Sequence, residues 1–203
     1  MVDAVILDFD GVILDSAKIK DEAFSKLYTC YPKLYEEAMR HHMCFPGMTR
    51  YKKFSYVAEL AKNPDLEKEL LERFRFLVLT ELVYANYIPG ALEFMEKYHK
   101  KIPLYIISAS PVDELDEVTR SKKIHNYFTK IYGSVDDKSR YIIDIVRNND
   151  YNENSVIFVG DMISDYMATK NVEVKFIGIE NDYTNFPEDV DTIDNLLSLS
   201  VYF

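Results

Sequence analysis

Short apolar runs that alternate with amphipathic stretches constrain the fold of this chain more than any other feature. The first run, residues 5–7 in "AVILDFDGVILDS", has the branched side chains of a buried strand. Four similar runs lie at 102–108, 129–134, 155–161 and 172–179. Residues 91–101, 112–122, 138–148 and 164–171 have the mixed apolar and charged spacing of surface helices. This alternation predicts an α/β fold with a parallel five-stranded sheet flanked by helices.

The segment between the first strand and "IPG" at 88–90 interrupts this alternation. It contains no convincing strand, and four stretches in it have the pattern of amphipathic helices: "DEAFSKLYTCY", "KLYEEAMRHHM", "YKKFSYVAELA" and "LEKELLERFRFLVLTELVYAN". Pro32, Pro46 and Pro64 punctuate these stretches. We therefore expect an all-helical domain at 15–87, inserted into an α/β core that is formed by residues 1–14 and 88–203.

Composition and charge exclude several classes of protein. With 203 residues, of which 48% are hydrophobic, the chain can bury a substantial core. Its net charge of -10 opposes binding to nucleic acid. Because the first apolar run is short and has no basic leader, we expect a cytoplasmic protein that does not bind membranes. We also expect a monomer or dimer. Cys30 and Cys44 are the only cysteines, and we expect both to be reduced.

Polar side chains follow four of the five expected strands. Each has an ordinary explanation by itself, as a turn residue, a surface charge or a helix cap. The carboxyl ends of parallel strands, however, meet at one edge of a sheet, and ligands bind in the crevice there. We therefore expect a functional site at this edge, formed by Asp8, Asp10, Ser108, Lys138, Asp161 and Asp165.

The order of these residues resembles the motifs of the haloacid dehalogenase-like superfamily of phosphotransferases. "DFDGV" matches its Asp-x-Asp-x-Thr/Val motif, Ser108 its second motif, Lys138 its third and "GDMISD" its Gly-Asp-x-x-x-Asp motif. Members with a helical cap carry it where the insert lies here. "YIPGALEFMEKY" and "HNYFTKIYGS" are similar to the phosphoglycolate phosphatase and β-phosphoglucomutase branch. The resemblance implies a Rossmann-like core domain and an inserted cap domain.

The resemblance also implies a chemistry. Asp8 would be the nucleophile that forms an aspartyl phosphate, and Asp10 would be the general acid and base. Ser108, backbone N–H groups near Ala109 and the Lys138 ammonium would bind the phosphoryl oxygens. Members that hydrolyse carbon–halogen bonds lack the second aspartate, so the presence of Asp10 argues against dehalogenation.

The metal that the resemblance implies is Mg²⁺, which prefers oxygen ligands. Its ligands would be the Asp8 side chain, the Asp10 carbonyl and the Asp161 side chain, with Asp165 in support. The expected activity is that of a phosphatase acting on a small phosphorylated metabolite, either a sugar phosphate or a phosphoglycolate-like acid. Two alternatives stay open: a phosphomutase, and a non-catalytic signalling module that is phosphorylated on an aspartate.

The insert contains one candidate substrate loop, "CFPGMTRYKKF". We expect Arg50 to contact an anionic or hydroxylated substrate, and Lys52 and Lys53 are weaker candidates. The alternative is that these three cations form the solvated face of the following helix.

Overall fold

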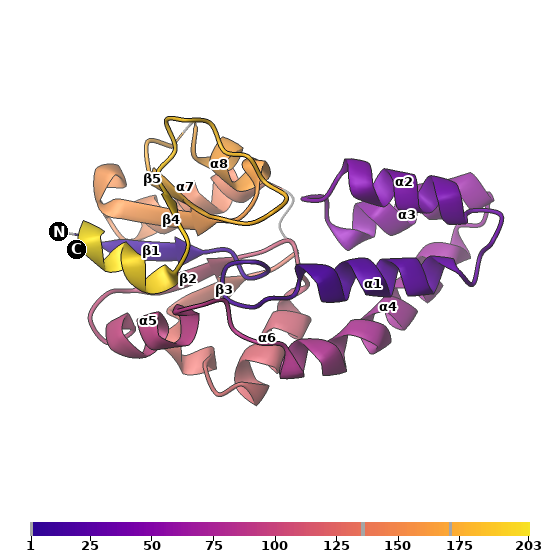
Figure 1. Cartoon of the computed structure of the whole chain (residues 1–203), viewed down its shortest axis with the longest axis horizontal. Helices are drawn as coiled ribbons and strands as arrows, with labels where there is room; N and C mark the ends of the chain where they lie inside the picture. Colours follow the sequence, from indigo (N-terminus) through magenta and orange to yellow (C-terminus); the bar gives the residue numbers. More distant parts are fainter. Residues whose placement is uncertain (1, 135–136, 171) are drawn as a thin grey trace. The chain divides into compact units, whose positions relative to one another are not determined.

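The computed structural model describes residues 2–134, 137–170 and 172–203 and divides the chain into two compact units (Figure 1). One unit consists of Met1–Asp15 and Asn86–Phe203, and the other is Ser16–Ala85. Val135 and Asp136, in the polar segment before Lys138, lie outside the described residues, as does Asn171 at the end of an expected helix. In the described part of the chain, no helix combines the length and apolar character that crossing a bilayer requires.

The larger unit is built on a parallel sheet with the strand order β3-β2-β1-β4-β5-β6. The strands are β1 (Ala4–Leu7), β2 (Leu104–Ile107), β3 (Lys130–Tyr132), β4 (Val156–Gly160), β5 (Lys175–Ile179) and β6 (Thr192–Ile193). The α/β fold with a parallel sheet is confirmed, but the sheet has six strands instead of the expected five. The sixth strand has only two residues, which is too short to produce a recognisable apolar pattern.

Helices cover both faces of this sheet. Figure 1 shows α7 (Lys138–Asn148) and α8 (Ile163–Thr169) on one side, and α5 (Ala91–Tyr98) and α6 (Val112–Ser121) on the other. Three short 3-10 helices complete the unit: η1 (His125–Tyr127), η2 (Glu153–Ser155) and η3 (Leu196–Tyr202). Because both faces are covered, every residue of β1, β2 and β4 is buried.

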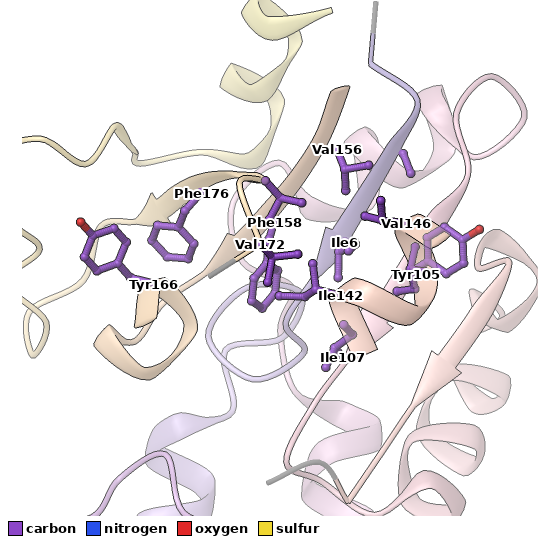
Figure 2. Packing of buried hydrophobic residues seen from close by; sticks show 13 residues of the cluster. Ile6, Tyr105, Ile107, Ile142, Val146, Val156, Phe158, Tyr166, Val172 and Phe176 are labelled. Atoms are coloured by element: carbon purple, nitrogen blue, oxygen red, sulfur yellow. The ribbon is translucent and has the colours of Figure 1, made fainter. Parts of the chain in front are cut away.

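Alternate strand residues form the core beneath α7 and α8 (Figure 2). Ile6 of β1 lies beside Tyr105 of β2 and Phe158 of β4, in register across the three central strands. Ile142 and Val146 of α7 belong to the same buried cluster. This packing fixes the start of α7 against the sheet, and Lys138 is the first residue of that helix.

The smaller unit, Ser16–Ala85, is entirely helical in the structure. Its helices are α1 (Ala17–Tyr28), α2 (Tyr35–Cys44), α3 (Arg50–Ala61) and α4 (Asp65–Tyr84). Phe24, Phe54 and Phe74 come from three of these helices and meet in its interior, with ring centroids 4.3–5.5 Å apart. The unit is therefore held together by large aromatic side chains.

The sheet core predicts a sharp contrast between two valine substitutions in the larger unit. Val156→Ala removes two methyl groups from a fully buried position of β4 and should lower the free energy of unfolding by about 2 kcal/mol. Val201→Ala makes the same change where 77% of the residue is exposed, so it should cost less than about 0.5 kcal/mol. Urea denaturation of both variants measures the difference, and equal losses would contradict this account of the core.

Candidate active site

The turn after β1 presents the first carboxylate of the candidate site. The backbone N–H of Asp8 continues the sheet by donating to Val159 O, at 2.9 Å, and its Oδ1 accepts from Phe9 N at 2.7 Å. Gly11 then adopts a φ of +76°, a conformation that glycine adopts at little cost. A Cβ on Gly11 would lie 2.1 Å from Asp161 Oδ2, so the glycine also allows two segments of the site to meet.

Lys138 joins two buried carboxylates. Its Nζ lies 3.0 Å from Asp8 Oδ1 and 2.7 Å from Asp165 Oδ1, and all three side chains are almost inaccessible to solvent. The lysine is held at the start of α7 by an N-cap, in which Asp137 Oδ1 accepts from Ser139 N at 3.0 Å. An ammonium group placed in this way fixes the orientation of both carboxylates.

Asp165 is bonded to the protein through both carboxylate oxygens. Oδ1 accepts from Lys138, and Oδ2 accepts from Met162 N at 3.2 Å. Its side chain also lies against Gly160, where an added Cβ would come within 2.4 Å of Asp165 Cβ. The carboxylate of Asp165 is therefore held by Lys138 of α7 and by the backbone at the start of its own helix, against Gly160 of β4.

Asp161 differs from Asp165 in one respect that matters for a metal. Its Oδ2 accepts from Tyr183 Oη at 2.8 Å, whereas its buried Oδ1 has no hydrogen-bond partner among the described residues. Ligand atoms of Asp8, Asp161 and Asp165 all lie within 4.8 Å of one another. An unpaired buried carboxylate oxygen is costly, and hard carboxylate oxygens are what Mg²⁺ prefers. The residues present fit a divalent cation at this position.

The electrostatics of the cluster support the same conclusion. Burial raises the pKa of Asp8 to about 7, because it outweighs the opposing effect of Lys138. Burial, together with the charges of Asp8 and Asp165, raises the pKa of Asp161 well above its usual value. Burial by itself would lower the pKa of Lys138, but the two carboxylates it binds raise it overall. The one ammonium in this cluster therefore does not compensate three carboxylates, and a bound cation would favour ionisation of Asp8 and Asp161.

The end of β2 supplies the hydroxyl groups of the site. Ser108 is buried, and its Oγ accepts from Ser110 N at 3.1 Å, with Ala109 between the two serines. Ser110 Oγ donates to Asp10 Oδ2 at 2.8 Å. The second carboxylate of the "DFD" motif is therefore oriented by a hydroxyl that lies 100 residues away in the sequence.

Three polar residues at this edge did not emerge from the sequence motifs. Ser110 stands in the same "SAS" as Ser108, while Asn181 and Tyr183 follow β5 in "IENDYTN". Asn181 and Tyr183 could have been found from their position in the sequence, because they follow β5 and its carboxyl end lies at the same edge of the sheet.

Arg50 and Lys53 are buried residues of α3, whereas Lys52 is exposed. The Arg50 guanidinium lies 4.6 Å from the centroid of the Phe74 ring, and Lys53 Nζ lies 2.9 Å from His42 Nδ1. Of the three cations in the candidate substrate loop, only Lys52 therefore lies on a solvated helix face, as the alternative expectation had it.

The raised pKa of Asp8 predicts how the stability of the metal-free protein depends on pH. Because the folded-state pKa is about 7 and the ordinary value is 3.8, ionisation of Asp8 destabilises the fold progressively between these two pH values. Asp8→Asn removes that ionisation. Its gain in unfolding free energy over wild type should grow from pH 4 to pH 7 and exceed about 1.4 kcal/mol at neutral pH.

Urea denaturation in EDTA at several pH values measures this gain. Asp191→Asn is the control, because Asp191 is exposed and pairs with Lys175 at 2.8 Å, so this variant should change stability by less than about 1 kcal/mol. If the gain from Asp8→Asn were independent of pH, this reading of the buried cluster would be wrong.

Comparisons with known proteins agree with the fold. Residues 5–179 match the model of the haloacid dehalogenase-like hydrolases. The phosphorylated carbohydrates phosphatase of Thermotoga maritima is 27% identical over 186 residues, which cover 87% of this chain and 84% of that protein.

Two solved structures have the same fold. One is a predicted phosphoglycolate phosphatase from Haemophilus somnus, with a TM-score of 0.76, 14% identity and coverage of 100% of this chain and 98% of that one. The other is the β-phosphoglucomutase of Clostridium difficile, with a TM-score of 0.74, 18% identity and coverage of 98% and 93%. The family match spans most of the chain and all four strand-end motifs, and the protein accordingly belongs to the haloacid dehalogenase-like hydrolase family.

Proposed function

We propose that this protein is a Mg²⁺-dependent phosphatase that hydrolyses a small phosphorylated metabolite, a sugar phosphate or a phosphoglycolate-like acid. The observation that carries the proposal is the buried cluster in which Lys138 binds Asp8 and Asp165 while one oxygen of Asp161 stays unpaired. The name of the Thermotoga maritima relative supports a phosphorylated carbohydrate as the substrate. Membership in a hydrolase family argues against the non-catalytic signalling module.

Asp8 is the residue we assign as nucleophile. Lys138 Nζ and Phe9 N both bind its Oδ1, so the carboxylate is held in one orientation before the substrate arrives. In the first step a carboxylate oxygen of Asp8 bonds to phosphorus, and the bond between phosphorus and the ester oxygen breaks. The products of this step are an aspartyl phosphate and the alcohol.

Asp10 is assigned as the general acid and base. It donates its proton to the departing ester oxygen in the first step and accepts a proton from the attacking water in the second. Attack by this water on phosphorus releases inorganic phosphate and restores the carboxylate of Asp8. The hydrogen bond from Ser110 Oγ to Asp10 Oδ2 supports this role, because it restricts rotation of the acid.

The remaining residues of the site are assigned to bind the phosphoryl group and the metal. The Ser108 hydroxyl and the N–H groups near Ala109 are assigned to the phosphoryl oxygens, and Lys138 compensates the charge that these oxygens carry in the transition state. Asp8, the carbonyl of Asp10 and Asp161 would hold Mg²⁺, and Asp165 would orient Lys138. When bound, Mg²⁺ supplies positive charge that favours the ionised form of Asp8 and draws negative charge from the phosphoryl group.

A panel of phosphorylated metabolites tests the proposal, with free phosphate and isomerised product both measured in Mg²⁺ and in EDTA. We expect Mg²⁺-dependent phosphate release that is abolished in Asp8→Asn, because an amide is not a nucleophile for this step. Asp10→Asn should slow turnover by about 10²–10⁴-fold, the usual size of acid–base assistance. Isomerised product without phosphate would favour the phosphomutase, and full activity of Asp8→Asn would refute the mechanism.

The helical unit, Ser16–Ala85, is proposed as the cap that selects the leaving group, with Arg50 as the contacting residue. The substitution to use is Arg50→Met, since an apolar side chain preserves the packing on Phe74. It should lower kcat/KM for the metabolite by about tenfold, or about 1.4 kcal/mol, and leave hydrolysis of an aryl phosphate nearly unchanged. The control is Lys52→Met, which replaces an exposed cation on the same helix. Equal losses on both substrates would contradict a role in selection.

A further inference from the structure

The loop that follows β5 forms two hydrogen bonds to Asp161. Tyr183 Oη donates to Asp161 Oδ2 at 2.8 Å, and Asn181 Nδ2 donates to the backbone carbonyl of Asp161 at 2.9 Å. One loop therefore holds both the side chain and the main chain of Asp161, which is one of the residues assigned above to bind the metal.

Asn181 also builds the loop itself. Its Oδ1 accepts from Tyr183 N at 3.0 Å and from Thr184 N at 2.7 Å, and its Nδ2 reaches Ile179 O, the last residue of β5, at 3.3 Å. Side-chain bonds of this kind fix a turn locally. The backbone at Tyr183 is thus tied to the end of β5 through the side chain of Asn181.

Phe186 anchors the far end of the same loop. Its ring lies 5.6 Å from that of Phe176, and it packs so closely over Gly178 that a Cβ there would come within 2.6 Å of it. The loop is therefore fastened to β5 at both ends, with Tyr183 between the two attachments.

The hydroxyl of Tyr183, and not its ring, makes the contact with the site. Tyr183 is 54% exposed, so its ring contributes little to the core. Its Oη nevertheless lies beside Gly11, where an added Cβ would be 3.1 Å from Tyr183 Oη and 2.1 Å from Asp161 Oδ2. The absence of a side chain at Gly11 leaves room for this hydroxyl–carboxylate pair.

The consequence appears at the two oxygens of Asp161. Oδ2 is occupied by Tyr183, and Oδ1 is buried without a hydrogen-bond partner in the described part of the chain. We propose that Tyr183 is a positioning residue for the divalent cation: by occupying Oδ2 it fixes the carboxylate of Asp161 and leaves Oδ1 as the one oxygen of this carboxylate that binds the metal. This inference rests on the proposed function, because it assumes the Mg²⁺ site assigned there.

Loss of the hydroxyl should weaken metal binding without abolishing it. Without its donor, the Asp161 carboxylate is freer to rotate. Metal binding then costs the conformational entropy that is lost when the carboxylate is ordered. Removing a hydrogen-bond partner of a metal-ligating carboxylate typically costs 10–100-fold in metal affinity. The change is specific to the oxygen of Tyr183, so phenylalanine is the substitution that isolates it.

The test is isothermal titration calorimetry of Mg²⁺ into the metal-free protein. Tyr183→Phe should weaken the affinity about tenfold or more. The matched control is Tyr202→Phe, which removes a hydroxyl that also donates to a carboxylate, Asp191 Oδ2 at 3.3 Å, and should leave the affinity unchanged. Asp161→Ala should abolish the binding, and Asp165→Ala should weaken it less than Asp161→Ala does.

These variants separate the two ideas. If Asp161→Ala abolishes binding while Tyr183→Phe stays within threefold of wild type, the positioning role is overturned and the metal site stands. If Asp161→Ala binds Mg²⁺ as wild type does, the proposed metal site falls and the inference falls with it.

Steady-state kinetics provide a second readout that damage to the fold would not reproduce. In Tyr183→Phe, the Mg²⁺ concentration for half-maximal activity should rise about tenfold while kcat at saturating Mg²⁺ returns close to wild type. A kcat that stays low at every Mg²⁺ concentration would overturn the positioning role. The melting temperature in EDTA should fall by only about 2–6 °C, because the ring of Tyr183 is half exposed and the variant loses a single hydrogen bond to a buried carboxylate.

Discussion

The ammonium group of Lys138, held between the buried carboxylates of Asp8 and Asp165, is the interaction on which the geometry of the site depends. Its Nζ lies 3.0 Å from Asp8 Oδ1 and 2.7 Å from Asp165 Oδ1, and so joins the end of β1, the start of α7 and the first turn of α8. Burying these charges is costly, and a single lysine compensates only part of them. The surrounding hydrogen bonds, from Phe9 N, Met162 N and Tyr183 Oη, reduce that cost, and a bound cation would reduce it further.

The interior of the helical unit has the opposite charge. Arg50 and Lys53 are buried there, and Lys53 Nζ binds His42, whose Nε2 lies 3.0 Å from Asp21 Oδ1. Burial lowers the pKa of Lys53 to about 8, with Asp21 acting against this effect. Each unit therefore buries charged side chains, carboxylates in the larger unit and cations in the helical one, beside its apolar core. The contrast suits the proposed function, in which carboxylates bind a metal and cations meet an anionic substrate.

The geometry of the site is held by loops that are short and anchored at both ends. The serines after β2 orient Asp10, the N-cap at Asp137 places Lys138, and the turn around Asn181 places Tyr183. Each of these attachments is a hydrogen bond that involves at least one side chain. Rigid attachment of this kind keeps reacting groups in place before a substrate binds, which is where much of the catalytic advantage of an enzyme arises.

The sequence alone determined the alternation of strands and helices, the place of the helical insert and the strand-end residues of the candidate site. Those features are local, because a buried strand and an amphipathic helix each leave a periodic pattern within a few turns of chain. Tertiary structure decided the rest. The short strand β6 has too few residues for a pattern. The contacts of Ser110 with Asp10 and of Tyr183 with Asp161 join residues 100 and 22 positions apart, and no local pattern records them. Whether Arg50 or Lys52 is buried likewise depends on which residues pack against α3, and only the folded chain brings those residues together.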